Sequence, residues 1–363
     1  MLSTAYRIGF YMKIPRTDPE VLVFSLKSRY TGVSATVNAL VPLQVREWRL
    51  EYVGPKMPNG IEPISVMKAL KISLRPPKDR PFRIWHLRRN NEMLLGVIAR
   101  DLFRLPIKLV FTSAAQRRHS ALPRWLISKM NAVICTSEAA AEFVPNVSAV
   151  VPHGIDTKRF PAPLNKEVAW RDSGLPGKWG IGIFGRIRPE KGTDIFVDAM
   201  IQVLPKFPDF TAVIAGLVQP KFEPFYAELK SKIASAGLSD RIVFLGEIPS
   251  DQIHLWYQRC LICVACPRYE AFGLTLFEAA SSECAVIGSR TGAFESLALD
   301  GKTGRLIEVG DSLSLIEAAG QVMNDPNNSL EMGRCASQVV NSRFSIATEA
   351  DGIGQVYRYL WHL

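Results

Sequence analysis

Short apolar runs alternate with helical patterns along both halves of this sequence. In the first half we predict strands at Val21–Phe24, Trp48–Val53, Phe82–His86, Ile107–Thr112, Ala132–Thr136 and Ala149–Val151. The second half repeats the pattern at Trp179–Phe184, Phe210–Ala215, Ile242–Leu245, Leu261–Ala265 and Ala285–Gly288. Helical spacing separates these runs, for example over Asn91–Phe103. Because parallel strands need a crossover element between them, the alternation predicts parallel α/β sheets.

The length of the chain favours two domains. It has 363 residues, of which 47% are hydrophobic, so two cores can be buried well. The segment Phe160–Gly177 is rich in Pro and polar residues and reads as a linker. We therefore expect one domain at residues 1–165, a second at 170–345, and a final helix over Ile346–Leu360.

The net charge of +10 is unevenly distributed. Through Phe160 the chain has 25 Lys and Arg against 11 Asp and Glu, a net of +14, and the remainder has a net of −4. A basic half suggests a nucleic acid, an anionic membrane surface or an anionic acceptor as partner, although plain solubility also explains it. No nucleic-acid-binding motif is visible, so we favour an anionic acceptor at a membrane surface and no nucleic acid.

The N-terminal sequence and the cysteines indicate where in the cell the protein works and whether it binds a metal. The start, Met1–Arg7, lacks the pattern of a signal peptide, and no apolar run has the length of a membrane span. We expect a cytoplasmic enzyme, at most peripheral to the inner face of a membrane. Cys260, Cys263 and Cys266 have metal-ligand spacing, but strand alternation would send Cys263 and Cys266 to opposite faces, so no metal site is expected.

A phosphate-binding pattern follows the strand Trp179–Phe184. Gly185 and Arg186 form a turn, and Lys191 and Gly192 stand at a helix start. A guanidinium offers a planar fork to phosphate and an ammonium offers a point charge. The pattern predicts an anion site, most simply a phosphate site.

Two carboxylates follow the strand Leu261–Ala265. Glu270 lies in the loop after the strand, and Gly273 begins a helix. Glu278 lies on that helix, eight residues after Glu270. A helix N-terminus offers unpaired N–H groups to an anion. Taken alone, the pair also fits a solvated helix face.

Together these motifs resemble family 4 of the retaining glycosyltransferases. The resemblance rests on Gly185-Arg186-x4-Lys191-Gly192, Glu270-x7-Glu278 and Pro152-His153-Gly154-Ile155-Asp156. It implies the GT-B fold, with two Rossmann-like domains facing a central cleft and a C-terminal helix, within 346–363, crossing back to the N-terminal domain. It also implies transfer from a sugar nucleotide with no metal and no cofactor, the cationic side chains replacing Mg²⁺.

The resemblance assigns roles on the donor side. Arg186 and Lys191 hold the diphosphate, Glu270 contacts the sugar hydroxyls, and Glu278 binds the ribose. The full set of expected donor-binding residues is Gly32, Gly185, Arg186, Lys191, Glu270, Phe272, Gly273, Leu274 and Glu278. Gly32 belongs to Thr31-Gly32-Val33, which also fits an ordinary strand–helix turn.

The acceptor side is expected in the basic half. His86 is a candidate because it lies at the end of a predicted strand, where α/β sites are built. It would orient the acceptor or transfer a proton, unless its role is structural. The expected anion-binding side chains are Arg88, Arg89, Arg117 and Arg118, although each could simply face solvent. With Arg186, Lys191 and Glu270, His86 completes the candidate catalytic residues.

The whole chain looks like the bacterial lipopolysaccharide core mannosyltransferases. That likeness implies GDP-mannose as donor and the acidic sugar Kdo of the lipid-linked inner core as acceptor. A glucosyl or galactosyl core transferase that uses a UDP-sugar would show the same motifs. Two alternative functions outside the transferases are a GT-B epimerase and a non-catalytic protein that binds a membrane surface.

Overall fold

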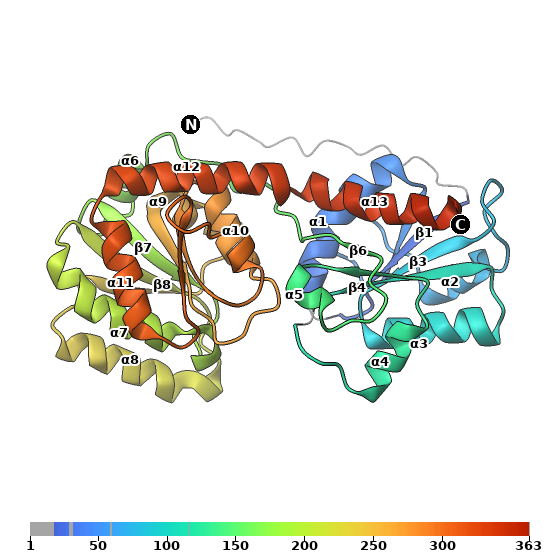
Figure 1. Cartoon of the computed structure of the whole chain (residues 1–363), viewed down its shortest axis with the longest axis horizontal. Helices are drawn as coiled ribbons and strands as arrows, with labels where there is room; N and C mark the ends of the chain where they lie inside the picture. Colours follow the sequence, from blue (N-terminus) through green and yellow to red (C-terminus); the bar gives the residue numbers. More distant parts are fainter. Residues whose placement is uncertain (1–17, 29–31, 59, 115, 363) are drawn as a thin grey trace, which may run out of the picture. The chain divides into compact units, whose positions relative to one another are not determined.

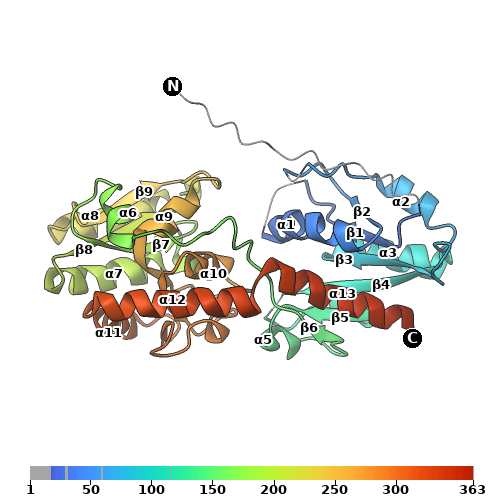
Figure 2. The same cartoon turned by 90° about the horizontal axis from the view of Figure 1, so that it is seen from above.

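The computed structural model describes residues 18–28, 32–58, 60–114 and 116–362, and it contains two six-stranded sheets (Figure 1). In spatial order the first sheet contains β2 (Leu50–Val53), β1 (Val21–Phe24), β3 (Arg83–Leu87), β4 (Ile107–Ser113), β5 (Ala132–Cys135) and β6 (Ala149–Val150). The pairs β1–β2, β1–β3, β3–β4 and β5–β6 are parallel. This sheet runs from blue to green in Figure 1, and Figure 2 shows it from above.

The second sheet is parallel throughout. In spatial order it contains β12 (Gly304–Ile307), β11 (Ala285–Ser289), β10 (Cys260–Ala265), β7 (Trp179–Phe184), β8 (Phe210–Ala215) and β9 (Ile242–Gly246). The prediction of two parallel α/β sheets is therefore confirmed, and each strand predicted from the apolar runs is present to within a few residues.

The helices fill the crossovers. In the first half they are α1 (Gly32–Glu47), α2 (Val66–Ile72), α3 (Asn90–Val97), its π-helical continuation η1 (Ile98–Leu102), α4 (Ala121–Ser128) and α5 (Glu138–Ala141). In the second half they are α6 (Lys166–Arg171), α7 (Thr193–Val203), α8 (Glu223–Ser235), α9 (Ile253–Arg259), α10 (Leu274–Ser281), α11 (Ser312–Met323), α12 (Pro326–Arg343) and α13 (Ile346–His362). Single 3₁₀ turns are η2 (Pro189–Lys191), η3 (Leu204–Lys206), η4 (Pro220–Phe222) and η5 (Phe294–Ser296).

Strand alternation places a separate core on each face of the second sheet. Ile181 and Ile183 of β7 pack with α7, α8 and α11, whereas the opposite face packs with α6, α9, α10 and α12. On that second face β7 presents Gly180 and Gly182. A Cβ on Gly180 would lie 2.2 Å from the ring of Trp170, which is fully buried. The glycines of β7 therefore make room for aromatic side chains.

Two features of the second half differ from the prediction. The segment Phe160–Gly177 is not simply a linker, because it contains α6, and Trp170 of α6 belongs to the core of the second sheet. The edge strand β12 was not predicted. It is four residues long, begins with Gly304 and contains Arg305, so it lacks the apolar run of a buried strand.

Packing divides the chain into two compact units, Met1–Phe111 with Trp361–Leu363, and Thr112–Leu360. The boundary lies within β4, whereas the sheets separate between β6 and β7, so the domain bounds at 165 and 170 remain a prediction. The end of α13 joins the first unit: Trp361 Nε1 donates to the Phe82 carbonyl at 3.2 Å, and its ring lies 5.5 Å from that of Trp48. This is the helix that was expected to cross back.

In the part of the chain that the structure describes, we find no helix with both the length and the apolar character needed to cross a membrane.

Candidate active site

The second sheet reverses its strand order between β7 and β10. From β7 the chain builds outward through β8 and β9, then returns to the other side of β7 to form β10, β11 and β12. In open parallel sheets, ligands bind beyond the carboxyl ends of the strands at such a switch point. Both loops that carry the sequence motifs leave the sheet here, 185–192 after β7 and 266–273 after β10.

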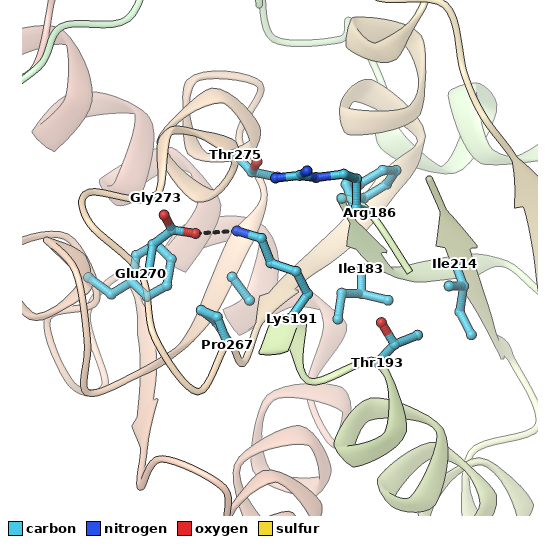
Figure 3. A pocket seen from close by; sticks show the side chains of 13 residues that line it. Ile183, Arg186, Lys191, Thr193, Ile214, Pro267, Glu270, Gly273 and Thr275 are labelled. Carbon is cyan, nitrogen blue, oxygen red and sulfur yellow. Dashed lines mark hydrogen bonds and ion pairs between the residues drawn. The ribbon is translucent and has the colours of Figure 1, made fainter. Parts of the chain in front are cut away.

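A small cavity lies between these two loops (Figure 3). Its volume is about 30 Å³, so it holds at most a few water molecules. The lining residues are Ile183, Phe184, Gly185, Arg186, Lys191, Thr193, Ile214, Ala265, Pro267, Glu270, Gly273, Thr275 and Phe294. A ligand much larger than water must therefore lie over the mouth of the cavity or move side chains aside.

Lys191 and Glu270 form an ion pair at this cavity. The lysine Nζ donates to Oε2 of the glutamate at 2.5 Å, and Figure 3 shows the two side chains pointing toward each other. They are 28% and 20% exposed, so both remain accessible to solvent. Separating the pair would free a cation for phosphate and an acceptor for hydroxyl groups.

The backbone around Glu270 holds its carboxylate in place. Oε1 accepts from the Ala271 N–H at 3.0 Å, and the Glu270 N–H donates to Oγ1 of Thr291 at 3.3 Å. Gly292 has φ of +64°, and a Cβ there would lie 2.7 Å from the Phe272 carbonyl oxygen. The loop after β11 is therefore packed closely against the loop that carries Glu270.

Contacts outside the cavity join the two motif loops. Gly192, with φ of +73°, lies against β10 so closely that a Cβ would be 1.9 Å from the Cys266 carbonyl oxygen. Arg268 donates to both carboxylate oxygens of Asp194 at 2.9 and 2.7 Å, a bidentate pair. These contacts hold Lys191 and Glu270 next to each other. No sequence pattern indicated this pairing.

Gly273 is required at the start of α10 for two reasons. Its φ is +97°, which favours glycine, and a Cβ would lie 2.2 Å from the ring of Phe294. The N-terminus of α10 thus begins at the cavity, with Thr275 of its first turn in the lining. Its N–H groups supply the anion-binding end that the sequence predicted.

Glu278 lies further along α10 and is paired with an aromatic hydroxyl. Tyr257 donates its hydroxyl to Oε2 of Glu278 at 3.1 Å. Desolvation raises the pKa of the Glu278 carboxyl, and the Tyr257 hydroxyl lowers it in part. Burial likewise raises the pKa of Tyr257, with the Glu278 charge adding to the effect. Tyr257 gave no signal in the sequence.

The other expected donor residues divide into exposed and buried groups. Gly185 and Arg186 are exposed and line the cavity, and Leu274 is partly exposed at the start of α10. Phe272 is 3% exposed, and its ring stacks on that of Phe277 with centroids 4.9 Å apart. This placement does not support a donor contact by the Phe272 side chain, because the ring belongs to the core.

In the first sheet, His86 lies inside β3 and is fully buried. Burial lowers the pKa of His86 well below its ordinary value, with the Arg88 charge adding to the effect. In this structure the imidazole is therefore enclosed within its unit. The expectation that His86 orients the acceptor or handles a proton is therefore not supported, because the strand extends one residue further than predicted.

A buried carboxylate organises the loop after β3. Glu92 is fully buried and accepts from two backbone N–H groups, that of Leu26 at 2.9 Å and that of Arg88 at 2.8 Å. Arg88 is 7% exposed, and Arg89 reaches Ser34 at 3.4 Å. The order β2-β1-β3 makes this a second switch point. Sequence reasoning named the arginines and missed the role of Glu92.

The remaining candidates, two on the acceptor side and one on the donor side, lie in loops and at a helix start. Arg117 and Arg118 are exposed. Gly32 is exposed at the start of α1, and no atom lies within 4 Å of a Cβ built there. Its neighbour Thr31 lies outside the described residues. Gln116, which precedes Arg117, donates its amide to the Gly292 carbonyl at 2.8 Å, so the loop that carries Arg117 and Arg118 lies beside the loop that packs against Glu270.

The His153–Asp156 turn is held by a carboxylate that sequence reasoning missed. Glu349 accepts from the Gly154 N–H at 2.7 Å, and its other oxygen lies 2.9 Å from Nδ1 of His153. Gly154 is itself close to α13, since a Cβ there would lie 2.5 Å from the Ser345 carbonyl oxygen. Asp156 is exposed and accepts from the Lys158 N–H, a structural role.

The chain belongs to a family of glycosyltransferases. The model of the group 1 glycosyl transferases matches residues 169–339, which include both motif loops and the Lys191–Glu270 pair. The match therefore covers the second sheet and the loops at its switch point.

Two curated relatives match nearly the whole chain. It is 41% identical to the lipopolysaccharide core biosynthesis mannosyltransferase LpcC of Rhizobium leguminosarum bv. viciae, over 94% of this chain and 97% of that protein. It is 39% identical to LpsB of Rhizobium meliloti, which has the same description, over 94% of this chain and 98% of that protein.

Solved structures agree in fold. The C-terminal domain of LpcC from Francisella tularensis, a group 1 family protein, is 37% identical, with a TM-score of 0.52, covering 53% of this chain and all of that one. HepE of Anabaena, solved in complex with UDP, covers 94% of this chain and all of its own with a TM-score of 0.79. At 18% identity, HepE supports the fold alone.

Proposed function

We propose that this glycosyltransferase moves mannose from GDP-mannose, with retention of anomeric configuration, to the Kdo-containing inner core of lipopolysaccharide. The main support is the 41% identity to a lipopolysaccharide core mannosyltransferase along 94% of the chain. The strongly basic first half agrees with an anionic, lipid-linked acceptor. The enzyme would then work in the cytoplasm at the inner face of the bacterial inner membrane.

The donor side of the reaction follows from the cavity. The diphosphate lies at the N-terminus of α10 and draws Lys191 away from Glu270, while Arg186 closes over the phosphates from the exposed side. Negative charge grows on the leaving diphosphate as the glycosidic bond breaks, and these cations and the helix dipole stabilise it. The freed Glu270 accepts hydrogen bonds from the sugar hydroxyls, and Glu278 accepts from the ribose.

The proposed reaction needs no metal ion and no cofactor. The two side-chain cations and the α10 N-terminus perform the charge stabilisation that Mg²⁺ supplies in other phosphoryl and glycosyl transferases. Full activity after treatment with a chelator is the expected result. Loss of activity on chelation, restored by Mg²⁺ or Mn²⁺, would refute this part of the proposal.

A donor screen tests the function. Purified enzyme is given GDP-mannose, UDP-glucose or UDP-galactose with Kdo-lipid A, and the product is identified by mass spectrometry and its anomeric configuration by NMR. Transfer from GDP-mannose is expected, and Lys191→Ala should lose it while the exposed Lys178→Ala control keeps it. Transfer only from a UDP-sugar would identify a glucosyl or galactosyl core enzyme. Epimerised donor without transfer, or no nucleotide binding, would point to the epimerase or to the non-catalytic binder.

A further inference from the structure

The helix α10 connects the small cavity to Glu278. Thr275, in the first turn of α10, lines the cavity (Figure 3), and Glu278 comes three residues later on the same helix. Residues three apart share one face of a helix and lie about 4.5 Å apart along its axis. A ligand whose anionic group occupies the start of α10 can therefore extend along this face as far as Glu278.

The carboxylate of Glu278 is held at one oxygen only. Oε2 accepts the hydrogen bond of 3.1 Å from the Tyr257 hydroxyl, and Glu278 makes no other hydrogen bond or ion pair with the residues that the structure describes. The side chain is partly exposed. The second oxygen, Oε1, is thus left for a group of the ligand, and a carboxylate oxygen accepts from hydroxyls such as those of a ribose.

Packing fixes the position of the Tyr257 hydroxyl. The residue belongs to α9 and is 2% exposed. Its ring meets that of Phe184 edge to face, with the centroids 5.0 Å apart, and lies 5.8 Å from the ring of Phe160. Lys166 and Cys284 both donate to its backbone carbonyl at 3.0 Å. Because Phe184 also lines the cavity, the hydroxyl has a fixed place relative to the cavity itself.

We propose that Tyr257 is a positioning residue for the ribose of the sugar nucleotide. By holding Oε2 of Glu278, its hydroxyl turns Oε1 toward the ribose hydroxyls. Because Tyr257 is buried, it acts through Glu278 and does not contact the ligand. This role of Tyr257 rests on the proposed function, in which Glu278 accepts from the ribose. It holds for GDP-sugars and UDP-sugars alike, since both carry the same ribose.

Binding of GDP and of 2′,3′-dideoxy-GDP, measured by calorimetry, tests this role. The wild type should prefer GDP by about 10-fold or more, because a hydrogen bond to a charged group contributes at least that factor. In Tyr257→Phe the preference should fall about threefold or more, the factor of one modest hydrogen bond. Affinity for the dideoxy ligand should stay nearly unchanged. The matched control is Tyr226→Phe, which removes a hydroxyl on α8 from a ring that packs on Phe244, and it should keep the wild-type preference.

A double-mutant cycle shows whether Tyr257 acts through Glu278. Glu278→Ala should lose the preference for GDP, and adding Tyr257→Phe to it should leave the GDP affinity unchanged. A structural role of the hydroxyl would instead lower GDP affinity equally with and without Glu278, and that result would overturn the proposal. So would a wild-type preference for GDP in Tyr257→Phe alone.

Kinetics with GDP-mannose give a second readout. In Tyr257→Phe the KM should rise while kcat stays within about twofold, because the ribose lies away from the breaking bond and binds equally well in substrate and transition state. A fall in kcat with KM unchanged would overturn the proposal.

UDP and 2′,3′-dideoxy-UDP, measured alongside, separate this role from the proposed function. If only UDP shows a ribose preference that Tyr257→Phe reduces, or if GDP binds without mannosyl transfer, the proposed function is refuted and the role of Tyr257 stands. Binding of neither nucleotide would refute both.

Discussion

The close approach of Gly192 to β10 makes a quantitative prediction about stability. In Gly192→Ala the alanine must adopt φ of +73°, and its Cβ would lie 1.9 Å from the backbone carbonyl oxygen of Cys266. The left-handed conformation costs about 1–2 kcal/mol for a non-glycine residue. Relief of the clash requires the two loops to separate by more than 1 Å, and overpacking of this kind costs about 1–3 kcal/mol. The total is therefore about 2–5 kcal/mol.

Gly174 supplies a matched control. It has nearly the same φ, +72°, but no atom lies within 4 Å of a Cβ built there. Gly174→Ala should therefore show only the conformational cost of about 1–2 kcal/mol. Thermal unfolding of the two variants measures the difference, since 1 kcal/mol shifts the Tm of a unit this size by about 2–4 °C. Gly192→Ala should also bind GDP more weakly, because Lys191 moves away from Glu270. Equal Tm losses in the two variants would refute the claim that loop contact makes Gly192 necessary.

Three other substitutions test the site and its supports. Glu270→Gln removes the charge that pairs with Lys191 and should lower kcat by about 100-fold or more with the Tm nearly unchanged; a kcat near wild type would contradict the role given to this carboxylate. Burial raises the pKa of the Glu92 carboxyl above its ordinary value of 4.5, so its contribution to stability is full below pH 4.5 and is lost as pH rises through the raised pKa. The Tm of the wild type, measured relative to Glu92→Gln, should accordingly fall as pH rises, and a pH-independent difference would exclude this assignment. Lys166 is 4% exposed and its Nζ donates to the carbonyls of Tyr257, Cys260 and Ser282, so Lys166→Met should cost about 2–5 kcal/mol, whereas Lys178→Met on the surface should cost almost nothing. Urea unfolding monitored by tryptophan fluorescence compares the two variants. Similar midpoints for both would contradict the claim that the hydrogen bonds of Lys166 to the buried carbonyls stabilise the fold.

Local patterns were sufficient for most of the fold. An apolar run such as Phe210–Ala215 needs burial on both faces, which only a covered parallel sheet provides, so its prediction did not depend on distant residues. The edge strand β12 has no such run, because one side of an edge strand is not covered by a neighbour. The helix α6 was missed for a related reason: three of its six residues are charged, and Trp170 is the one apolar side chain that it buries in the core.

The residues of the candidate site also divide into those that the sequence predicted and those that it did not. The side chains that we propose bind the donor, Arg186, Lys191, Glu270 and Glu278, stand in loops, in a 3₁₀ turn and on a helix, where residue type and spacing already indicate their chemistry. The residues that hold them in place gave little signal. Arg268 and Asp194 are 74 residues apart, and Tyr257 and Glu278 are 21 apart, so neither pairing is visible in a local pattern.

His86 illustrates the limit of reasoning from strand ends. The predicted strand ends at His86, whereas β3 includes His86 and its imidazole is fully buried, and sequence patterns do not resolve strand ends that finely. The same strand ends in the structure at Leu87, and the groups that follow it are arranged by Glu92.

The sequence by itself determined two parallel α/β sheets, a basic first half and the side chains that we propose bind the donor. Only the tertiary structure decided that Lys191 and Glu270, 79 residues apart, meet at 2.5 Å beside the start of α10. The physical reason is that strand order depends on how helices and strands from the whole unit pack together. That order, β10 next to β7, is what brings the two loops to one edge of the sheet.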